Sequence, residues 1–190
     1  MASPKQNLIF ITGGAKSGKS SFAINAASSI CGKKAFIATA EALDDEMLMR
    51  IQRHKRERAE DWLTLEEPLN IGPLLKDVHL LYEVILIDCL TLWLSNLLLT
   101  SRNVEVDVQG FLESVTLYKD HPPCTNPPKS RSLFIVSNEV GLGIVPDNAL
   151  ARRFRDAAGE LHQRIAALAD EVYLVAAGIP LKIKGVVQST

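Results

Sequence analysis

The stretch from Asn7 to Ser20 reads NLIFITGGAKSGKS, in which an apolar strand runs directly into a glycine-rich turn. The turn has the spacing Gly13-x-x-x-x-Gly18-Lys19-Ser20. Glycine at positions 13, 14 and 18 allows several backbone N–H groups to point inward toward a polyphosphate. Lys19 supplies a cation for the β- and γ-phosphates, and the Ser20 hydroxyl is suited to ligate Mg²⁺. The segment therefore predicts a nucleotide-binding loop.

The residues on either side of the turn support this interpretation. A turn rich in Gly, Ser and Lys can also be an ordinary surface loop, and the pattern does occur by chance. Here the apolar run 8–11 precedes it, and apolar residues at helical spacing follow it, namely Phe22, Ala23, Ala26, Ala27 and Ile30. The strand, turn and helix together favour the phosphate-binding role.

Length and charge limit the other possibilities. A chain of 190 residues predicts a single domain, spanning residues 1–190. With Lys+Arg 21 against Asp+Glu 22, the net charge of −1 gives no global field that would attract nucleic acid or an anionic membrane. The longest apolar run, Leu90 to Leu99, is about half of the ~20 residues that a membrane-spanning helix needs.

The three cysteines and the N-terminus indicate a cytoplasmic protein. Cys31, Cys89 and Cys124 are odd in number and irregularly spaced, which fits neither a metal-binding motif nor a disulfide framework. We expect no signal peptide, because the first strand begins within about ten residues of Met1 and no cleavage site is visible there. We therefore expect a reducing compartment.

Apolar strands alternate with amphipathic helices along the whole chain. This predicts the α/β class, with a mostly parallel sheet covered by helices on both faces and ligands at the carboxyl ends of the strands. After the first strand and helix, strands are predicted at 34–39, 62–66, 84–87, 133–137, 172–176 and 181–184. Helices are predicted at 42–60, 71–82, 90–99, 106–119 and 147–169. The proline-rich segment 121–132 is predicted to be an exposed loop.

Asp88 ends the apolar strand 84–87. A carboxylate in this position resembles the second metal-binding element of phosphate-loop enzymes, which lies beside the magnesium ion. The alternative is that Asp88 only caps the helix that starts near Leu90. Because Lys19 and Ser20 are already present upstream, the metal role is favoured.

His54 lies in the predicted helix 42–60, among several cations. It follows Leu43, Met47 and Ile51 on one helical face, with Arg53 and Lys55 beside it in the sequence. Neighbouring positive charge disfavours the protonated imidazole, and a neutral imidazole is a competent nucleophile. On composition alone, the alternative is preferred: the charges complement the helix dipole and His54 only packs at the edge of the face.

The segment 137–146 is a weaker signal. Two glycines there permit close approach of a ligand, and Asn138 and Glu139 offer polar groups at the carboxyl end of a strand. Turns between strands and helices commonly contain glycine, so this segment alone indicates little.

Beyond these motifs, the chain closely resembles the bifunctional cobinamide kinase / cobinamide-phosphate guanylyltransferase family over nearly its whole length. Seven ordered blocks carry the resemblance: ITGGAKSGKS at 11–20, IATAEALDDEM at 37–47, RIQRHKRER at 50–58, the Trp62 to Glu66 segment, IDCLTLWLSNLL at 87–98, VSNEVGLGIVP at 136–146 and ARRFRDAAGELHQRIAALADEVYLVAAGIPLKIK at 151–184. In the last block, His162-Gln163 stands where many relatives have Asn before Gln.

The resemblance implies a P-loop NTPase fold of the RecA-like, recombinase type, assembled as a homotrimer. It implies a kinase that phosphorylates adenosylcobinamide with ATP or GTP and then transfers GMP from GTP onto that phosphate through a guanylylated histidine, in cobalamin biosynthesis. Mg²⁺ is the implied cofactor.

The resemblance also implies the site residues. The guanylylated histidine matches His54, against the interpretation from composition. Together with Lys19 of the glycine-rich turn, His54 is predicted to be catalytic. The implied nucleotide-contacting residues are Gly13, Gly14, Ala15, Lys16, Ser17, Gly18, Lys19, Ser20, Thr39, Ala40, Glu41, Lys55, Arg56, Glu57, Arg58, Glu66 and Asp88, and the implied metal ligands are Ser20 and Asp88.

Two alternatives keep the nucleotide-binding loop. One is a monofunctional small-molecule kinase in which His54 is structural and no covalent GMP adduct forms. The other is a nucleotide-gated binding module that changes its affinity for a partner rather than modifying a metabolite. Neither needs the blocks around His54.

Overall fold

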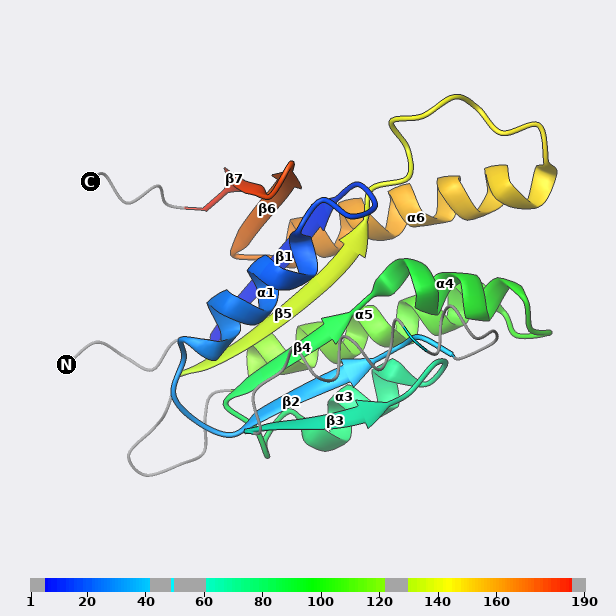
Figure 1. Ribbon diagram of the computed structural model, residues 1–190. Helices are drawn as coiled ribbons and strands as arrows, with labels where there is room; N and C mark the ends of the chain where they lie inside the picture. Colours follow the sequence, from blue (N-terminus) through cyan, green and yellow to red (C-terminus); the bar gives the residue numbers. More distant parts are fainter. Residues whose placement is uncertain (1–5, 42–48, 50–60, 122–129, 186–190) are drawn as a thin grey trace.

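The computed structural model describes residues 6–41, 49, 61–121 and 130–185. In this part of the chain seven strands form one sheet in the order β3-β2-β4-β5-β1-β6-β7 (Figure 1). Six strands run parallel, and only β7 is antiparallel to its neighbour β6. The strands are β1 (Gln6–Gly13), β2 (Lys34–Ala38), β3 (Trp62–Glu66), β4 (Val84–Asp88), β5 (Arg131–Asn138), β6 (Glu171–Ala176) and β7 (Ile179–Lys184).

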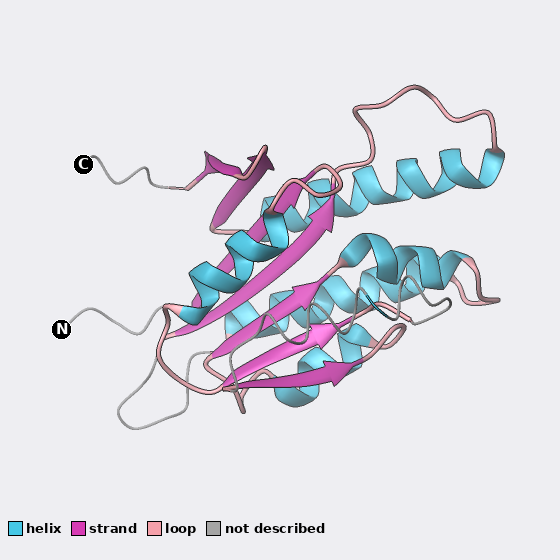
Figure 2. Cartoon of the chain, in the orientation of Figure 1, coloured by secondary structure: helices cyan, strands magenta, loops and turns pink. Residues whose placement is uncertain are grey.

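Helices cover both faces of this sheet (Figure 2). The helices are α1 (Lys19–Ser28), α3 (Ile71–Val78), α4 (Leu90–Leu98), α5 (Val104–Asp120) and α6 (Ala149–Leu168). Helix α1 packs on one face, and α3, α4, α5 and α6 pack on the other. The predicted α/β class, with a mostly parallel sheet covered by helices on both faces, is confirmed.

Alternate side chains of β1 are buried in the two cores on opposite faces of the sheet. Leu8 and Phe10 are buried in the core beneath α5 and α6, whereas Ile9 and Ile11 are buried beneath α1. Side chains of a strand point alternately to opposite faces, so a continuous apolar run is needed where both faces are covered. This two-sided burial fixes β1, and with it the position of the glycine-rich turn that follows.

The structure corrects the prediction for the proline-rich segment. Arg131 and Ser132 were expected in an exposed loop, but both are buried and begin β5. Long-range pairing explains this, because Ser132 pairs with Val84 of β4 and Asn7 of β1. The residues 122–129 of the same segment lie outside the described part.

Several element boundaries also differ from the predicted ones. Helix α3 ends at Val78 rather than 82. Helix α6 begins at Ala149, because the Asn148 side chain accepts hydrogen bonds from the N–H groups of Leu150 and Ala151 and so caps it. Strand β7 begins at Ile179 rather than 181.

Some predictions lie outside the described residues and stay predictions. These are the helix 42–60 apart from Met49, the nucleophile His54, the contacts of residues 55–58 and the state of Cys124. Cys31 and Cys89 are free thiols. Among the helices that the structure describes, none is long and apolar enough to cross a membrane.

Candidate nucleotide-binding site

The loop 13–20 connects β1 to α1 and is pressed against the turn between β6 and β7. A Cβ atom at Gly13 would stand 2.3 Å from the carbonyl oxygen of Val175, so this position has room only for glycine. Gly18 has φ +92°, a left-handed conformation that favours glycine, and it is the N-cap residue of α1. The N–H of Gly178 donates to the carbonyl of Ser17 at 2.8 Å. The loop is therefore held in a fixed curve at the helix N-terminus.

Lys19 and the Ser17 hydroxyl lie within this loop. The Lys19 side chain is buried, with Nζ donating to the carbonyl of Gly14 across the loop at 3.1 Å. The hydroxyl of Ser17 is buried without a hydrogen-bond partner within the described residues. Buried polar groups are ordinarily paired, so this hydroxyl is consistent with a polar ligand at the loop.

Asp88 lies at the carboxyl end of β4, at the same edge of the sheet as the loop. It pairs with Ala38 of β2 on one side and with Val136 of β5 on the other. The interpretation of Asp88 as the N-cap of α4 is wrong, because the N-cap is Cys89 and no side chain caps that end. The Asp88 side chain is thus not used for capping.

Hydrogen bonds between Thr39 and Cys89 connect the carboxyl ends of β2 and β4. Its fully buried hydroxyl donates to the carbonyl of Cys89 and accepts from the N–H of Cys89, both at 2.8 Å. The amide of Asn96 donates to the Thr39 carbonyl at 2.9 Å. Thr39 therefore fixes the edge on which Asp88 lies, while Ala40 is half-buried and Glu41 is exposed.

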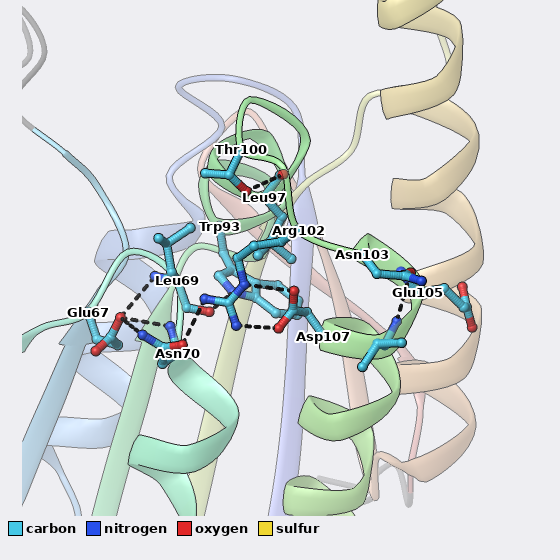
Figure 3. Close-up of polar contacts among 11 residues, drawn as sticks. Glu67, Leu69, Asn70, Trp93, Leu97, Thr100, Arg102, Asn103, Glu105 and Asp107 are labelled. Atoms are coloured by element: carbon cyan, nitrogen blue, oxygen red, sulfur yellow. Dashed lines mark hydrogen bonds and ion pairs between the residues drawn. The ribbon is translucent and has the colours of Figure 1, made fainter.

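Glu66 lies at the carboxyl end of β3, where its side chain is exposed. The segment that follows it is fixed by a separate polar cluster, shown in Figure 3. The Glu67 carboxylate accepts from the N–H groups of Leu69 and Asn70, and Arg102 bridges Asn70 to Asp107. The chain beyond Glu66 is thus anchored to α5.

The structure brings one group of predicted residues together and leaves another undescribed. The loop 13–20, the segment 39–41, Glu66 and Asp88 all lie at the carboxyl edge of the sheet, on strands in the order β3, β2, β4, β5 and β1. His54 and residues 55–58 lie outside the described part.

Burial and the neighbouring charges shift the pKa of the Cys89 thiol. Burial and the negative charge of Asp88 raise its pKa to about 11, while Lys19 acts in the opposite direction. Cys89 is therefore a neutral thiol at physiological pH, which excludes a thiolate nucleophile at this position.

Sequence reasoning missed two polar contacts near the loop. Ser137 Oγ lies 2.6 Å from Nε2 of His162 on α6, and burial lowers the pKa of His162 below its usual 6.5, although the charge of Glu139 acts to raise it. The Thr91 hydroxyl contacts Asn138. Each contact joins residues far apart in the sequence. The segment 137–146 and the block IDCLTLWLSNLL pointed to Asn138 and to the region of Thr91, but no local pattern indicated that these residues touch.

The donors at this edge suit a hard cation. Ser20 and Asp88 offer oxygen ligands, which Mg²⁺ prefers. Among the described residues no cluster of three or more His, Cys, Asp or Glu side chains could hold a metal by itself. Mg²⁺ is usually bound by one or two protein oxygens together with substrate phosphates, and this edge fits that description.

Comparison with known proteins points to one family. The family model described as "Cobinamide kinase / cobinamide phosphate guanyltransferase" matches residues 9–183. The bifunctional adenosylcobalamin biosynthesis protein CobP of Pseudomonas aeruginosa is 41% identical over 177 residues, covering 92% of this chain and 96% of that protein.

Two further relatives carry the same kind of name. The bifunctional adenosylcobalamin biosynthesis protein CobU of Escherichia coli is 39% identical over 183 residues, and that of Salmonella typhimurium is 38% identical over 192 residues. Each comparison covers 93% of this chain and 99% of the relative. Among solved structures, the RadB recombinase aligns with TM-score 0.49 and 9% identity, covering 88% of this chain and 73% of that chain.

Proposed function

The chain belongs to the cobinamide kinase / cobinamide phosphate guanyltransferase family, and from this membership we propose how its residues carry out the two reactions. It is a kinase and a guanylyltransferase of cobalamin biosynthesis. The specific proposal is that one phosphate-binding loop serves both reactions and that His54 carries GMP between them.

The observation that carries this proposal is the match over residues 9–183, which begins in β1 and covers all seven blocks apart from Lys184, the last residue of the seventh. It is supported by the geometry of the carboxyl edge, where a buried lysine and a strand-end carboxylate accompany the glycine loop. A monofunctional kinase accounts for the loop but leaves the second activity in the family's description without a role.

In the transferase reaction, the neutral imidazole of His54 attacks the α-phosphorus of GTP. A P–N bond forms, the bond from the α-phosphorus to the bridging oxygen breaks, and pyrophosphate leaves with the electron pair while the ring loses its proton. A phosphate oxygen of adenosylcobinamide phosphate then attacks the same phosphorus and the P–N bond breaks. The ring takes up a proton from solvent to replace the one it lost, which regenerates neutral His54. Covalent catalysis divides one difficult displacement into two easier ones.

In both reactions the loop binds the triphosphate. The N–H groups of residues 13–20 and the buried ammonium group of Lys19 would neutralise its charge, and residues 39–41, 55–58, Glu66 and Asp88 would complete the nucleotide site. The substrates are GTP, ATP, adenosylcobinamide and its phosphate.

Ser20 and Asp88 would hold Mg²⁺, which supplies further charge neutralisation on the phosphate oxygens. Lys19 acts from the protein side of the same phosphates, and its burial keeps the cation at the loop rather than in solvent. Positioning and charge neutralisation by these residues are the main protein contributions to phosphoryl transfer.

We extend the proposal to the organisation of the protein. Residues 1–190 form one nucleotide-binding domain, the protein assembles as a homotrimer, and it acts in the cytoplasm on small molecules. Size-exclusion chromatography with light scattering measures the assembly directly, and a monomer at micromolar concentration would contradict it.

The two activities can be separated in one assay. Purified protein is incubated with adenosylcobinamide, ATP and GTP, and the products are resolved by chromatography. Wild type should give first adenosylcobinamide phosphate and then adenosylcobinamide-GDP, whereas His54→Ala should stop at the phosphate. His121→Ala, which changes an exposed histidine at the end of α5, is the matched control and should form both products. Full conversion by His54→Ala would contradict the proposal.

A further inference from the structure

Asn138 lies at the end of β5, between the glycine loop that follows β1 and Asp88 at the end of β4. Strand β5 lies between β1 and β4, and Asn138 is the register partner of Gly13. On the other side, Asp88 pairs with Val136, two residues earlier in β5. Neighbouring strands are about 4.8 Å apart, so the last residue of β5 lies within one strand spacing of the first loop glycine and close to Asp88.

Thr91 holds Asn138 in a defined orientation. The hydroxyl of Thr91 accepts from the side-chain amide of Asn138 at 3.0 Å and from its backbone N–H at 3.3 Å. Thr91 is itself buried, and its hydroxyl lies 3.2 Å from the sulfur of Cys89. The hydroxyl thus accepts two hydrogen bonds from one residue, which fixes both the backbone and the side chain of Asn138.

This arrangement leaves part of the amide group for a ligand. An asparagine nitrogen carries two hydrogens, and one of them is used by Thr91. No acceptor for the second lies within the described residues. The half-buried amide therefore presents a neutral N–H donor at the edge where the loop and Asp88 meet.

The neighbouring Glu139 does not compete for this role. Its carboxylate accepts hydrogen bonds from the N–H groups of Gly141 and Leu142, within the loop that follows β5. Its charge acts on His162 of α6, on the face of the sheet away from α1. A carboxylate would also repel a phosphate, whereas an amide N–H attracts one, so Asn138 is the residue of the pair that suits a phosphate ligand.

We propose that Asn138 is a further catalytic residue, which donates its second amide N–H to the terminal phosphate of the bound nucleoside triphosphate, and that Thr91 is its positioning residue. This inference rests on the proposed function of the same site. In the kinase reaction the acceptor hydroxyl oxygen forms a bond to the γ-phosphorus while the bond from the γ-phosphorus to the β–γ bridging oxygen breaks. The nucleoside diphosphate leaves with the electron pair, the hydroxyl proton passes to solvent, and Asn138 stabilises the transferring phosphoryl group.

The proposal predicts a selective defect. A contact to the γ-phosphate strengthens the binding of a triphosphate but not that of a diphosphate. Calorimetry with β,γ-imido-ATP and ADP, each with Mg²⁺, measures this difference without cobinamide and without GMP transfer. Asn138→Ala should weaken the binding of the analogue about tenfold and leave ADP within about twofold. Kinase kcat should fall about 100-fold, with little change in KM for cobinamide.

Thr91 provides a second, independent test. Thr91→Val keeps the shape of the side chain but removes the hydroxyl, so it should reduce kinase kcat and the preference for the triphosphate, while Thr91→Ser restores both. A merely structural hydroxyl would change stability and leave the ratio of the two affinities unchanged. Asn25→Ala, on an exposed position of α1, is the matched control for Asn138→Ala and should change neither affinity.

The outcomes distinguish a failure of the proposed role of Asn138 from a failure of the proposed function. Equal losses for the analogue and ADP in Asn138→Ala, or unchanged values for both, overturn the role of Asn138. If wild type discriminates the two ligands through Asn138 but does not phosphorylate cobinamide, the contact stands and the proposed function fails. Circular dichroism melting of each variant identifies any that does not fold, and Thr91→Ser, the mildest change, then decides whether the hydroxyl is what matters.

Discussion

The hydroxyl oxygen of Ser137 lies 2.6 Å from Nε2 of His162, and this contact joins the end of β5 to α6. The next residue, Asn138, is the register partner of Gly13 in the phosphate loop. The ring of His162 also packs against Phe10 of β1, with centroids 5.5 Å apart. Burial disfavours the charged imidazolium and lowers the pKa of His162 below 6.5, although the charge of Glu139 acts to raise it.

This lowered pKa predicts a pH dependence of stability. The unfolded chain protonates His162 near pH 6.5, whereas the folded chain does so only at lower pH. The contribution of His162 to the free energy of unfolding is therefore complete above pH 6.5 and declines as the pH falls from there toward the folded pKa. Urea unfolding at intervals between pH 7.5 and about 5 measures it.

His162→Asn removes the titrating group while retaining a side chain that can bond to Ser137. We expect a smaller loss of stability between pH 7 and pH 5 in this variant than in wild type. His121→Asn, which makes the same substitution at the exposed end of α5, serves as the control. Identical slopes for wild type and His162→Asn would show that His162 is not the group responsible.

The first two loop glycines differ sharply in the space around them. In Gly13→Ala the new Cβ would meet the carbonyl oxygen of Val175 at 2.3 Å and Ser17 Oγ at 2.8 Å, whereas at Gly14 a Cβ meets nothing within 4 Å. Relieving the clash requires movement of the loop or of β6. Gly13→Ala should therefore weaken GTP binding by tenfold or more, on the order of 1–3 kcal/mol of strain, and Gly14→Ala should bind almost normally. Calorimetric titration of both variants with GTP tests this; equal affinities would be incompatible with the packing described.

Asp88→Asn tests the metal role at the end of β4. Loss of the carboxylate should shift the Mg²⁺ concentration that supports half-maximal kinase activity upward, and should lower kcat at saturating Mg²⁺ by about 100-fold. Asp77→Asn, at an exposed position of α3, makes the same change of charge away from the edge and should have no effect. An unchanged Mg²⁺ titration for Asp88→Asn would remove this residue from the metal site.

Trp93→Phe tests the packing that supports α4. Trp93 is 1% exposed, packs against Phe111 and donates from its indole nitrogen to the carbonyl of Leu69 at 2.8 Å (Figure 3). The change leaves that carbonyl without its donor and leaves a small cavity, so we expect the free energy of unfolding to fall by about 2 kcal/mol. Trp62→Phe should cost less, because the indole of Trp62 makes only a 3.4 Å bond to Ser28. Urea unfolding compares them, and the reverse order would contradict this assignment.

The parts of the fold that were predictable from sequence are those encoded locally. The apolar run Leu8–Ile11, the glycine turn and the helical spacing after it lie within a few residues of one another, and the strand ending at Asp88 is an equally local pattern. Strand β7 was predicted two residues short, because Pro180 reads as a strand breaker. The structure accommodates Pro180 on an edge strand, where a missing N–H is tolerated.

The parts that were not predictable depend on long-range contacts. Arg131 reads as part of a proline-rich loop, yet its buried guanidinium donates to the carbonyls of His79 and His121, which no local pattern encodes. The same is true of Thr39, whose partner Cys89 is fifty residues away. Alternation and spacing predict elements, whereas side-chain pairing across strand ends decides which residues the site contains.

The most direct test of the account is a labelling experiment with GTP that carries its label on the α-phosphate. Wild-type protein, His54→Ala and the control His121→Ala are each incubated with labelled GTP and Mg²⁺, denatured and divided between acid and alkali. We expect wild type and His121→Ala to retain label that is lost in acid and kept in alkali, as a phosphoramidate requires, and His54→Ala to retain none. Normal labelling of His54→Ala would show that this histidine does not carry GMP.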